Sequence, residues 1–138
     1  MAEGRVSEFV LDGVEARGPA RWPDEAHLLR RPLCAVYAIV AQGGDREACV
    51  YVGKTECTVL ERMRGHMKAR GMVRGVLRGL QAEGVSIAVY WWPCPKIGHR
   101  FHRIDHREQL AIALLKPHLN CIRYVHAEDR IRRKFVRG

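Results

Sequence analysis

Three short apolar segments predict β-strands in the first two thirds of the chain. They cover residues 33–41, 49–53 and 85–92, and each is rich in β-branched, aromatic or small apolar residues. Gly43-Gly44-Asp45 lies between the first two segments and suits a tight loop. The first two strands are therefore expected to pair as a hairpin.

Apolar positions at helical spacing predict three helices. Thr58 and Glu61 have the spacing of a capping box, which predicts a helix from there to about residue 69, ended by Gly71. A third helix is expected over residues 104–115, closed by Pro117. Between them, a second helix is predicted by an apolar stripe made of Met72, Val73, Val76, Leu77 and Leu80.

The predicted order of elements, β-β-α-α-β-α, indicates an α+β fold. Residues 1–33 are interrupted by proline and glycine and are expected to form an irregular arm, with one helical turn near residues 24–30. Residues 34–125 are expected to form the single domain. A strand at residues 121–125 and a short helix in the basic tail, residues 126–138, are expected to follow.

The charge of the chain indicates a polyanionic partner. It has 24 lysines and arginines against 15 acidic residues, a net charge of +9 and a pI near 9.8. Residues 62–82 hold six basic residues and no acidic one, and five more basic residues lie in the last ten. Such clustering is typical of phosphate binding, so we expect nucleic acid as the partner. The alternative is charge that serves solubility alone.

Other classes are disfavoured by cysteine usage and hydropathy. The five cysteines are odd in number and include no C-x-x-C pair, which argues against a disulfide framework and a zinc finger. No apolar segment has the length of a membrane span or a signal peptide. We therefore expect no membrane partner and a location in the cytoplasm or at the nucleoid.

Two triplets on the paired strands resemble the motifs that name the GIY-YIG nuclease superfamily. They are Ala35-Val36-Tyr37 and Tyr51-Val52-Gly53. The similarity continues over most of the chain, to about residue 120, through a further ordered set of matches: Arg62, His66, Glu108, Lys116-Pro117 and Asn120. Ala35 replaces the leading glycine, and the links before Tyr51 and before Arg62 look longer than usual. Arg64 is therefore the alternative to Arg62.

The resemblance implies a stand-alone nuclease domain with a central three-stranded antiparallel sheet flanked by helices. It implies a divalent-metal-dependent endonuclease with Mg²⁺ or Mn²⁺ held by Glu108. The implied catalytic residues are Tyr37, Tyr51, Arg62, His66 and Glu108. Tyr37 is the tyrosine expected to help deprotonate the water, and His66 is expected to relay the proton or to bond to Tyr37. The expected substrate-binding residues are Lys54, Arg70, Arg74, Arg78 and Asn120.

The chemistry of three of these residues agrees with that expectation. Arg62 and His66 are four residues apart and share a helix face, and arginine suits bidentate phosphate contact. Glu108 falls on an apolar helix face beside Ile104 and Ile112, where an unpaired carboxylate is costly and a metal ion accounts for it. Asp105 and Glu108 forming a helix-capping pair is the alternative.

Several alternatives remain open from the sequence. The chain could be a non-catalytic nucleic-acid-binding module or a protein-interaction adaptor that is basic by accident. Trp91 and Trp92 either stack on bases or pack the third strand. A zinc site is a weaker possibility, made from Cys94, His99, His102 and His106. DNA is favoured over RNA, and cleavage of both strands requires a homodimer or two visits. The biological role stays open among repair, restriction, homing and a weapon.

Overall fold

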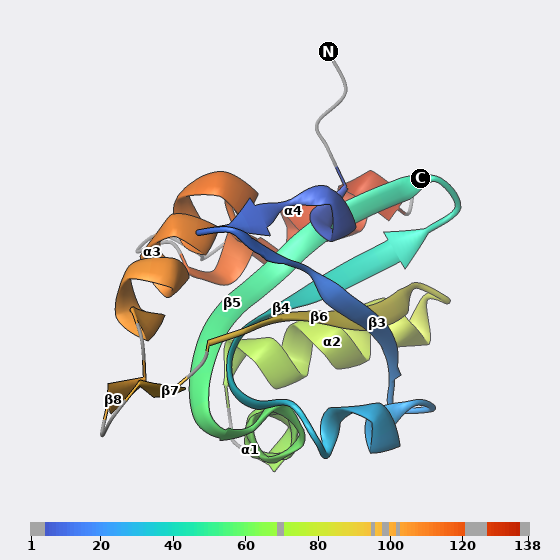
Figure 1. Cartoon of the computed structure of the whole chain (residues 1–138). Coiled ribbons are helices and arrows are strands. Elements are labelled where there is room, and N and C mark those ends of the chain that lie inside the picture. The colour runs from blue at the N-terminus through green and yellow to red at the C-terminus, as the bar shows by residue number, and fades with distance from the viewer. Residues whose placement is uncertain are drawn as a thin grey trace.

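The protein has an α+β fold built around one antiparallel sheet (Figure 1). The computed structural model describes residues 5–68, 71–94, 96–97, 100–101, 103–120 and 127–135. The sheet has four strands in the order β3-β6-β4-β5. Their bounds are Arg17–Trp22 for β3, Leu33–Gly43 for β4, Arg46–Thr58 for β5 and Ser86–Pro93 for β6.

The strand β4 lies in the middle of the sheet and is buried along most of its length. It pairs antiparallel with β5 on one side and with β6 on the other. Its apolar residues meet a packed layer on both faces of the sheet, which explains the nearly continuous apolar run. The predicted hairpin is confirmed, and Gly44 provides the positive φ of +62° at its turn.

The expected three-stranded sheet is wrong by one strand, because β3 adds a fourth. Residues 17–22 pair antiparallel with β6, and Ala20 is buried in the core. The expectation of an irregular arm over residues 1–33 is therefore wrong for this stretch. Gly18 and Pro19 are atypical of strands, so the sequence pattern did not predict one here. An edge strand tolerates them because one side of its backbone forms no hydrogen bonds to a neighbouring strand.

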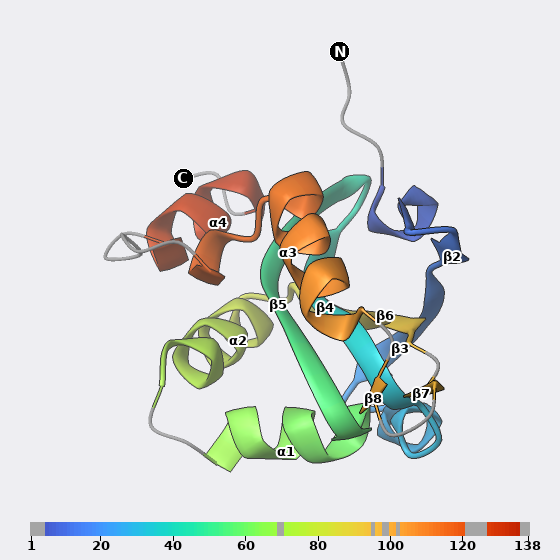
Figure 2. The same cartoon turned by 60° about the vertical axis from the view of Figure 1, so that its left-hand side comes forward.

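Two helices cover one face of the sheet, α1 (Val59–Lys68) and α2 (Met72–Ala82) (Figure 2). Thr58 accepts a 3.1 Å hydrogen bond from the backbone N–H of Glu61, which confirms the threonine half of the predicted cap. Gly71 precedes the first residue of α2 as its N-cap, so the prediction that it ends α1 is wrong. The apolar stripe of α2 is buried except at Met72, which is exposed.

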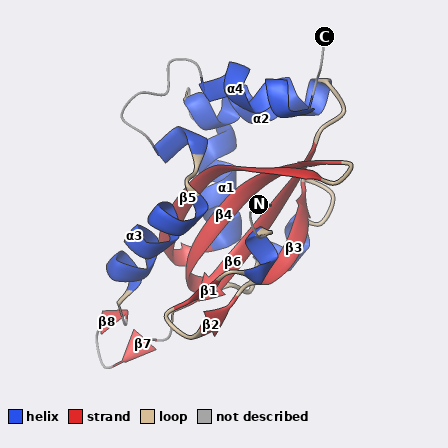
Figure 3. Ribbon diagram, turned by 90° about the horizontal axis from the view of Figure 1, so that it is seen from above, coloured by secondary structure: helices blue, strands red, loops and turns tan. Residues whose placement is uncertain are grey.

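The opposite face of the sheet is covered by α3 (Ile104–Leu115) and by the N-terminal segment (Figure 3). The predicted third helix is confirmed, and Lys116 ends it in the left-handed conformation just before Pro117. Arg107 is buried under this layer. Its guanidinium donates to Asp12 Oδ2 at 3.3 Å and to the carbonyl of Pro93 at 3.2 Å, which ties α3 to the N-terminal segment.

The remaining elements are short and peripheral. They are η1 (Val6–Glu8), β1 (Val10–Leu11), β2 (Val14–Glu15), η2 (Ala26–Leu29), β7 (Lys96–Ile97), β8 (Arg100–Phe101) and η3 (His118–Asn120). The predicted turn near residues 24–30 corresponds to η2. The strands β7 and β8 pair antiparallel with each other between β6 and α3. The strand predicted at residues 121–125 lies outside the described residues.

The basic tail forms the helix α4 (Ala127–Phe135), which packs on the domain. Ile131 is fully buried, and Phe135 lies against Gly43, where a Cβ would come within 2.8 Å of its ring. Arg132 forms an ion pair with Glu83. In the part of the chain that the structure describes, no helix is both long enough and apolar enough to cross a membrane.

Candidate active site

Two tyrosines and a glycine define the centre of the candidate site. Tyr37 on β4 lies opposite Gly53 on β5, and Tyr51 lies two residues before Gly53 on the same face of the sheet. A Cβ on Gly53 would come within 2.5 Å of Tyr37 Oη and 2.9 Å of Tyr51 Cε2. The glycine of the second triplet is therefore required by space, because the Tyr37 hydroxyl lies directly over it.

The helix α1 places His66 against both tyrosines. His66 Nε2 is 2.7 Å from Tyr37 Oη, and the imidazole meets the Tyr51 ring edge-on, with centroids 4.9 Å apart. Burial, and then the charge of Arg62, lower the pKa of His66, which keeps its ring neutral at neutral pH. We assign the hydroxyl of Tyr37 as the donor and Nε2 as the acceptor, since the phenol is protonated.

Arg62 connects the buried tyrosine to solvent. It lies one turn before His66, and its side chain is exposed. Interaction with the Tyr37 hydroxyl raises the pKa of the Arg62 guanidinium. Burial and the neighbouring Tyr51 raise the pKa of Tyr37 above its usual range, and Arg62 lowers it by a smaller amount. The site therefore holds a neutral phenol beside a permanent positive charge.

Glu108 on α3 acts on the same group of residues through its charge. The pKa of Glu108 is raised overall, and burial is the largest cause. Asp105 raises it further, while the positive charges of Lys54 and Arg62 lower it. The Glu108 carboxylate in turn raises the pKa of both tyrosines. The alternative of a capping pair is not seen in the structure, because the N-cap of α3 is Arg103 and receives no side-chain cap hydrogen bond.

Lys54 and Asp105 form an ion pair that links β5 to α3 beside Glu108. Both side chains are largely exposed, so the pair adds little to stability. The pair engages the ammonium group of Lys54, which is then less available to a phosphate. Among the described residues, Glu108 itself has no hydrogen bond or ion pair, so its oxygen atoms are available to a ligand.

The donor set at Glu108 fits a magnesium or manganese ion in one respect. A half-buried carboxylate is the hard oxygen ligand that these ions prefer, and Mg²⁺ commonly takes one or two carboxylates and completes its shell with water and phosphate oxygens. The described residues contain no group of three or more His, Cys, Asp and Glu side chains placed to hold a metal. Glu108 is the carboxylate of this group that forms no ion pair with a described residue, so it is the candidate ligand.

Asn120 supports the strand that carries Tyr51. Its Oδ1 accepts from the backbone N–H of Val52 and its Nδ2 donates to the carbonyl of Val52, both at 2.8 Å. Because β5 is an edge strand, these two bonds satisfy backbone groups that β4 does not reach. Both amide groups are thus used within the protein, which argues against the substrate contact expected for Asn120. It is a positioning residue.

The other predicted substrate-binding residues lie at the surface. Arg78 is exposed and Arg74 is half-buried, four residues apart on α2, and neither forms an ion pair with a described residue. Arg70 lies outside the described residues. Arg74 and Arg78 therefore share one side of α2, and no ion pair or hydrogen bond of the described residues joins them to the group around Glu108.

The weaker sequence hypotheses are partly resolved. Trp92 is fully buried and donates to the carbonyl of Phe9 at 3.0 Å, so it packs the core, while Trp91 is half-buried. Of the residues considered for zinc, Cys94 is buried and His106 is exposed. The other two, His99 and His102, lie outside the described residues.

One expected role does not agree with the geometry. Tyr37 has no exposed surface, so its hydroxyl is shielded from a water molecule in solvent. Tyr51 is only partly buried and is better placed to meet one. The ion pair through Asp105 was missed by sequence reasoning, although the spacing of Asp105 one turn before Glu108 was a usable signal.

Comparison of the chain with family models, with curated proteins and with solved structures finds no match. The convergence of these side chains is therefore the basis of the functional argument.

Proposed function

We propose that the protein is a divalent-metal-dependent endonuclease that hydrolyses phosphodiester bonds of nucleic acid, with DNA favoured over RNA. One observation supports this above the others: polar side chains from distant segments meet around the strands β4 and β5 or act on one another through their charge. They are Tyr37 from β4, Tyr51 from β5, Arg62 and His66 from α1, and Glu108 from α3.

The same proposal includes the GIY-YIG fold. In it, the strands β4, β5 and β6 with the helices α1, α2 and α3 form the core that the sequence resemblance implies, and β3 is an added edge strand. The support is that the two triplets lie side by side on paired strands, with Gly53 directly opposite Tyr37.

Each residue has a distinct part in the proposed reaction. The exposed guanidinium of Arg62 binds the scissile phosphate and neutralises its developing charge. Tyr51, partly exposed beside it, orients the attacking water. Tyr37 holds Arg62 and His66 in place through its hydroxyl and acts as a positioning residue.

His66 is neutral at neutral pH and its Nε2 accepts from the Tyr37 hydroxyl, so it is a positioning residue: its ring meets Tyr51 edge-on and fixes the tyrosine that orients the water, whose proton leaves to solvent. Glu108 is the protein ligand for Mg²⁺ or Mn²⁺. When bound, such an ion supplies Lewis-acid stabilisation of the phosphate and lowers the pKa of a coordinated water. The neighbouring carboxylate of Asp105 is paired with Lys54, so water and phosphate oxygens would complete the shell around Glu108.

The non-catalytic binding module is the competing function. It uses the same basic surface, with a net charge of +9, but has no need of an unpaired, half-buried carboxylate beside an arginine. That combination favours the enzyme, because an isolated carboxylate with a raised pKa is costly unless it serves a ligand.

The test is cleavage of end-labelled single-stranded, duplex and branched DNA and of single-stranded RNA, each in Mg²⁺, Mn²⁺ and EDTA. The variants are Glu108→Gln and, as the matched control, Glu61→Gln, an exposed acidic residue on α1. We expect metal-dependent cleavage that falls by roughly a hundredfold or more in Glu108→Gln and stays unchanged in Glu61→Gln.

Two results would contradict the proposal. Equal activity of Glu108→Gln and Glu61→Gln would show that Glu108 takes no part in cleavage. Salt-sensitive binding without cleavage of any substrate would favour the binding module, because phosphate contacts weaken steeply with salt whether or not the strand is cut.

A further inference from the structure

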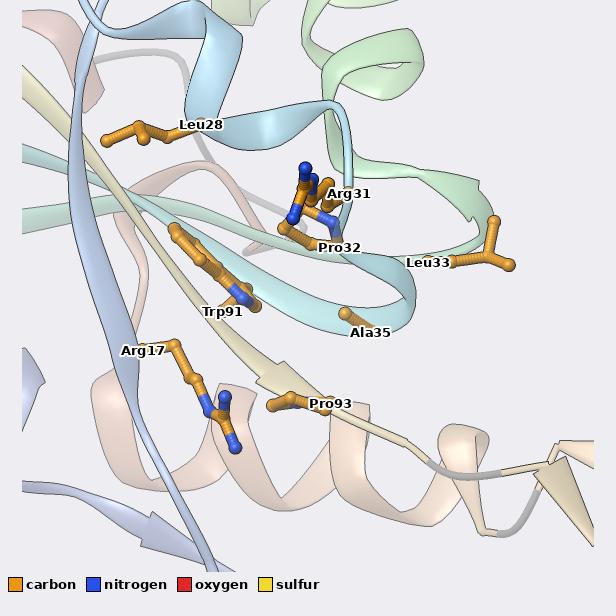
Figure 4. A pocket seen from close by; sticks show the side chains of 8 residues that line it. All are labelled: Arg17, Leu28, Arg31, Pro32, Leu33, Ala35, Trp91 and Pro93. Carbon is orange, nitrogen blue, oxygen red and sulfur yellow. The ribbon is translucent and has the colours of Figure 1, made fainter.

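A pocket of about 380 Å³ lies on the sheet next to the proposed active site, in the volume range of small-ligand sites (Figure 4). Its floor includes Trp91 of β6 and Ala35 of β4, the first residue of the AVY triplet. Figure 4 shows the indole of Trp91 in the middle, with Arg31 and Pro32 on one side and Arg17 on the other.

One row of paired residues connects this pocket to the active site. Across the sheet from β3 to β5, the successive partners are Arg17, Trp91, Tyr37 and Gly53. Directly paired residues point to the same face, and neighbouring strands are about 4.8 Å apart. Trp91 is therefore one strand away from Tyr37, and Arg17 is two strands away, about 10 Å.

The indole of Trp91 is held in place from one side. Gly18, with φ of +104°, passes so close that a Cβ there would come within 3.1 Å of Trp91 Cζ3 and 2.8 Å of the carbonyl oxygen of Val89. The strand β3 thus packs on the edge of the ring, while the ring remains half-buried and lines the pocket. A fixed, partly exposed indole is suited to stacking against a planar ligand.

Two arginines border the same pocket without partners of their own. The side chains of Arg17 and Arg31 are exposed, and neither forms an ion pair or side-chain hydrogen bond with a described residue. Arg31 stands next to Pro32, whose carbonyl accepts a 3.0 Å hydrogen bond from Val59, the first residue of α1. The wall of the pocket is therefore connected to the helix that carries Arg62 and His66.

From these features we infer that the pocket binds one nucleotide of a single-stranded nucleic acid, with its base stacked on Trp91 and its phosphates between Arg17 and Arg31. A planar ring and flanking negative charge are together the chemistry of a nucleotide, and single-strand sites combine such a stacking platform with a basic track. The base must be unpaired to reach the indole. This inference rests on the proposed function for its context and names the substrate: a strand with an unpaired nucleotide beside the cleaved bond.

The experiment measures binding by fluorescence anisotropy in EDTA, so that cleavage plays no part. The probes are labelled short oligo(dT), oligo(U) and a blunt DNA duplex. The test variant is Arg17→Ala/Arg31→Ala. Its matched control is Arg21→Ala/Arg30→Ala, which removes two exposed charges from the same segments but none from the pocket. A second pair compares Trp91→Phe with Trp22→Phe.

We expect the pocket double variant to bind oligo(dT) roughly tenfold more weakly than its control, and duplex equally. The slope of log affinity against log salt should become shallower by about 0.7 for each phosphate that the variant no longer neutralises. Oligo(dT) should quench tryptophan fluorescence in the wild type and in Trp22→Phe but not in Trp91→Phe. The ratio of oligo(dT) to oligo(U) affinity then distinguishes a DNA strand from an RNA strand.

Equal weakening in the two double variants would overturn the inference, as would equal weakening on duplex and single strand. Failure of the wild-type protein to bind either oligonucleotide would do the same. These outcomes are separate from those of the cleavage test. If the pocket variant loses single-strand affinity but the wild-type protein cuts no substrate, the nucleotide pocket is supported and the nuclease function is contradicted. If the wild-type protein cuts and the pocket variant binds like its control, the nuclease function is supported and the pocket is contradicted.

Discussion

The two faces of the sheet are filled in different ways. The face under α1 and α2 has a hydrogen-bonded polar pair, Tyr37 with His66, at the candidate site, while the buried polar groups of the face under α3, Arg107 and the Tyr90 hydroxyl, are bonded to other parts of the fold. A polar group in such surroundings is tolerated only with partners, so residues of the first face depend on one another. Changes around Tyr37 should alter the chemistry, and changes in the buried layer of the second face, away from the half-buried Glu108, should alter stability alone.

The largest expected effect is on the second face. Trp92→Ala removes a fully buried side chain and the hydrogen bond to Phe9, and should lower the free energy of unfolding by about 3–5 kcal/mol. Urea denaturation measures this. Cleavage per folded molecule should stay near the wild-type value, and a selective decrease of activity at full stability would break the comparison.

On the first face, Arg62→Ala should reduce cleavage by roughly a hundred- to a thousandfold, about 2.7–4 kcal/mol of transition-state stabilisation. Its exposed side chain contributes little to packing, so the unfolding midpoint should hardly change. Arg64→Ala is the matched control, because Arg64 is exposed on the same helix. The opposite order of effects would mean that Arg64 is the phosphate ligand.

A smaller effect is expected from Gly53→Ala, which acts on both quantities. The new methyl group would collide with the Tyr37 hydroxyl and displace it from His66, at a cost of about 1–3 kcal/mol of stability and with reduced cleavage. Gly65→Ala on α1 is the control, because a Cβ there meets nothing within 4 Å and alanine favours the helix. Wild-type behaviour of Gly53→Ala would show that the tyrosine has room to move.

The smallest effect concerns pH. The pKa of His66 is lowered by burial, so its contribution to stability is present above the ordinary value of 6.5 and is lost as pH falls through the lower folded value. Cleavage should fall over the same acidic range, because protonated His66 can no longer accept from Tyr37. A pH–rate profile checks this, with His66→Gln expected to lose the acidic limb.

His118 provides the control for that experiment. Burial, with Arg130 and Lys134, lowers its pKa as well, so it contributes to the pH dependence of stability. His118→Gln should therefore change the acid denaturation curve and leave the pH–rate profile as it is. A shift of the rate profile in His118→Gln would contradict the assignment of the acidic limb to His66.

The accuracy of the sequence predictions followed the burial of each segment. The strand β4 and the helix α2 were predictable because most of their apolar positions face a core and so repeat with the period of the element. The edge strand β3 was not, because Gly18 and Pro19 interrupt it and its pairing with β6 spans a long stretch of chain. The polar end of β5, residues 54–58, was missed because most of its side chains are at least partly exposed and show no apolar period.

The sequence by itself determined the α+β class, the hairpin of β4 and β5, and the set of polar residues worth testing, because these follow from local periodicity and residue chemistry. Only the tertiary structure decided which of those residues meet. It buried Tyr37 and left Tyr51 partly exposed, it used Asn120 on the backbone of Val52, and it aligned Trp91 with Tyr37. Burial and cross-strand register depend on contacts between segments distant along the chain, which no local pattern specifies.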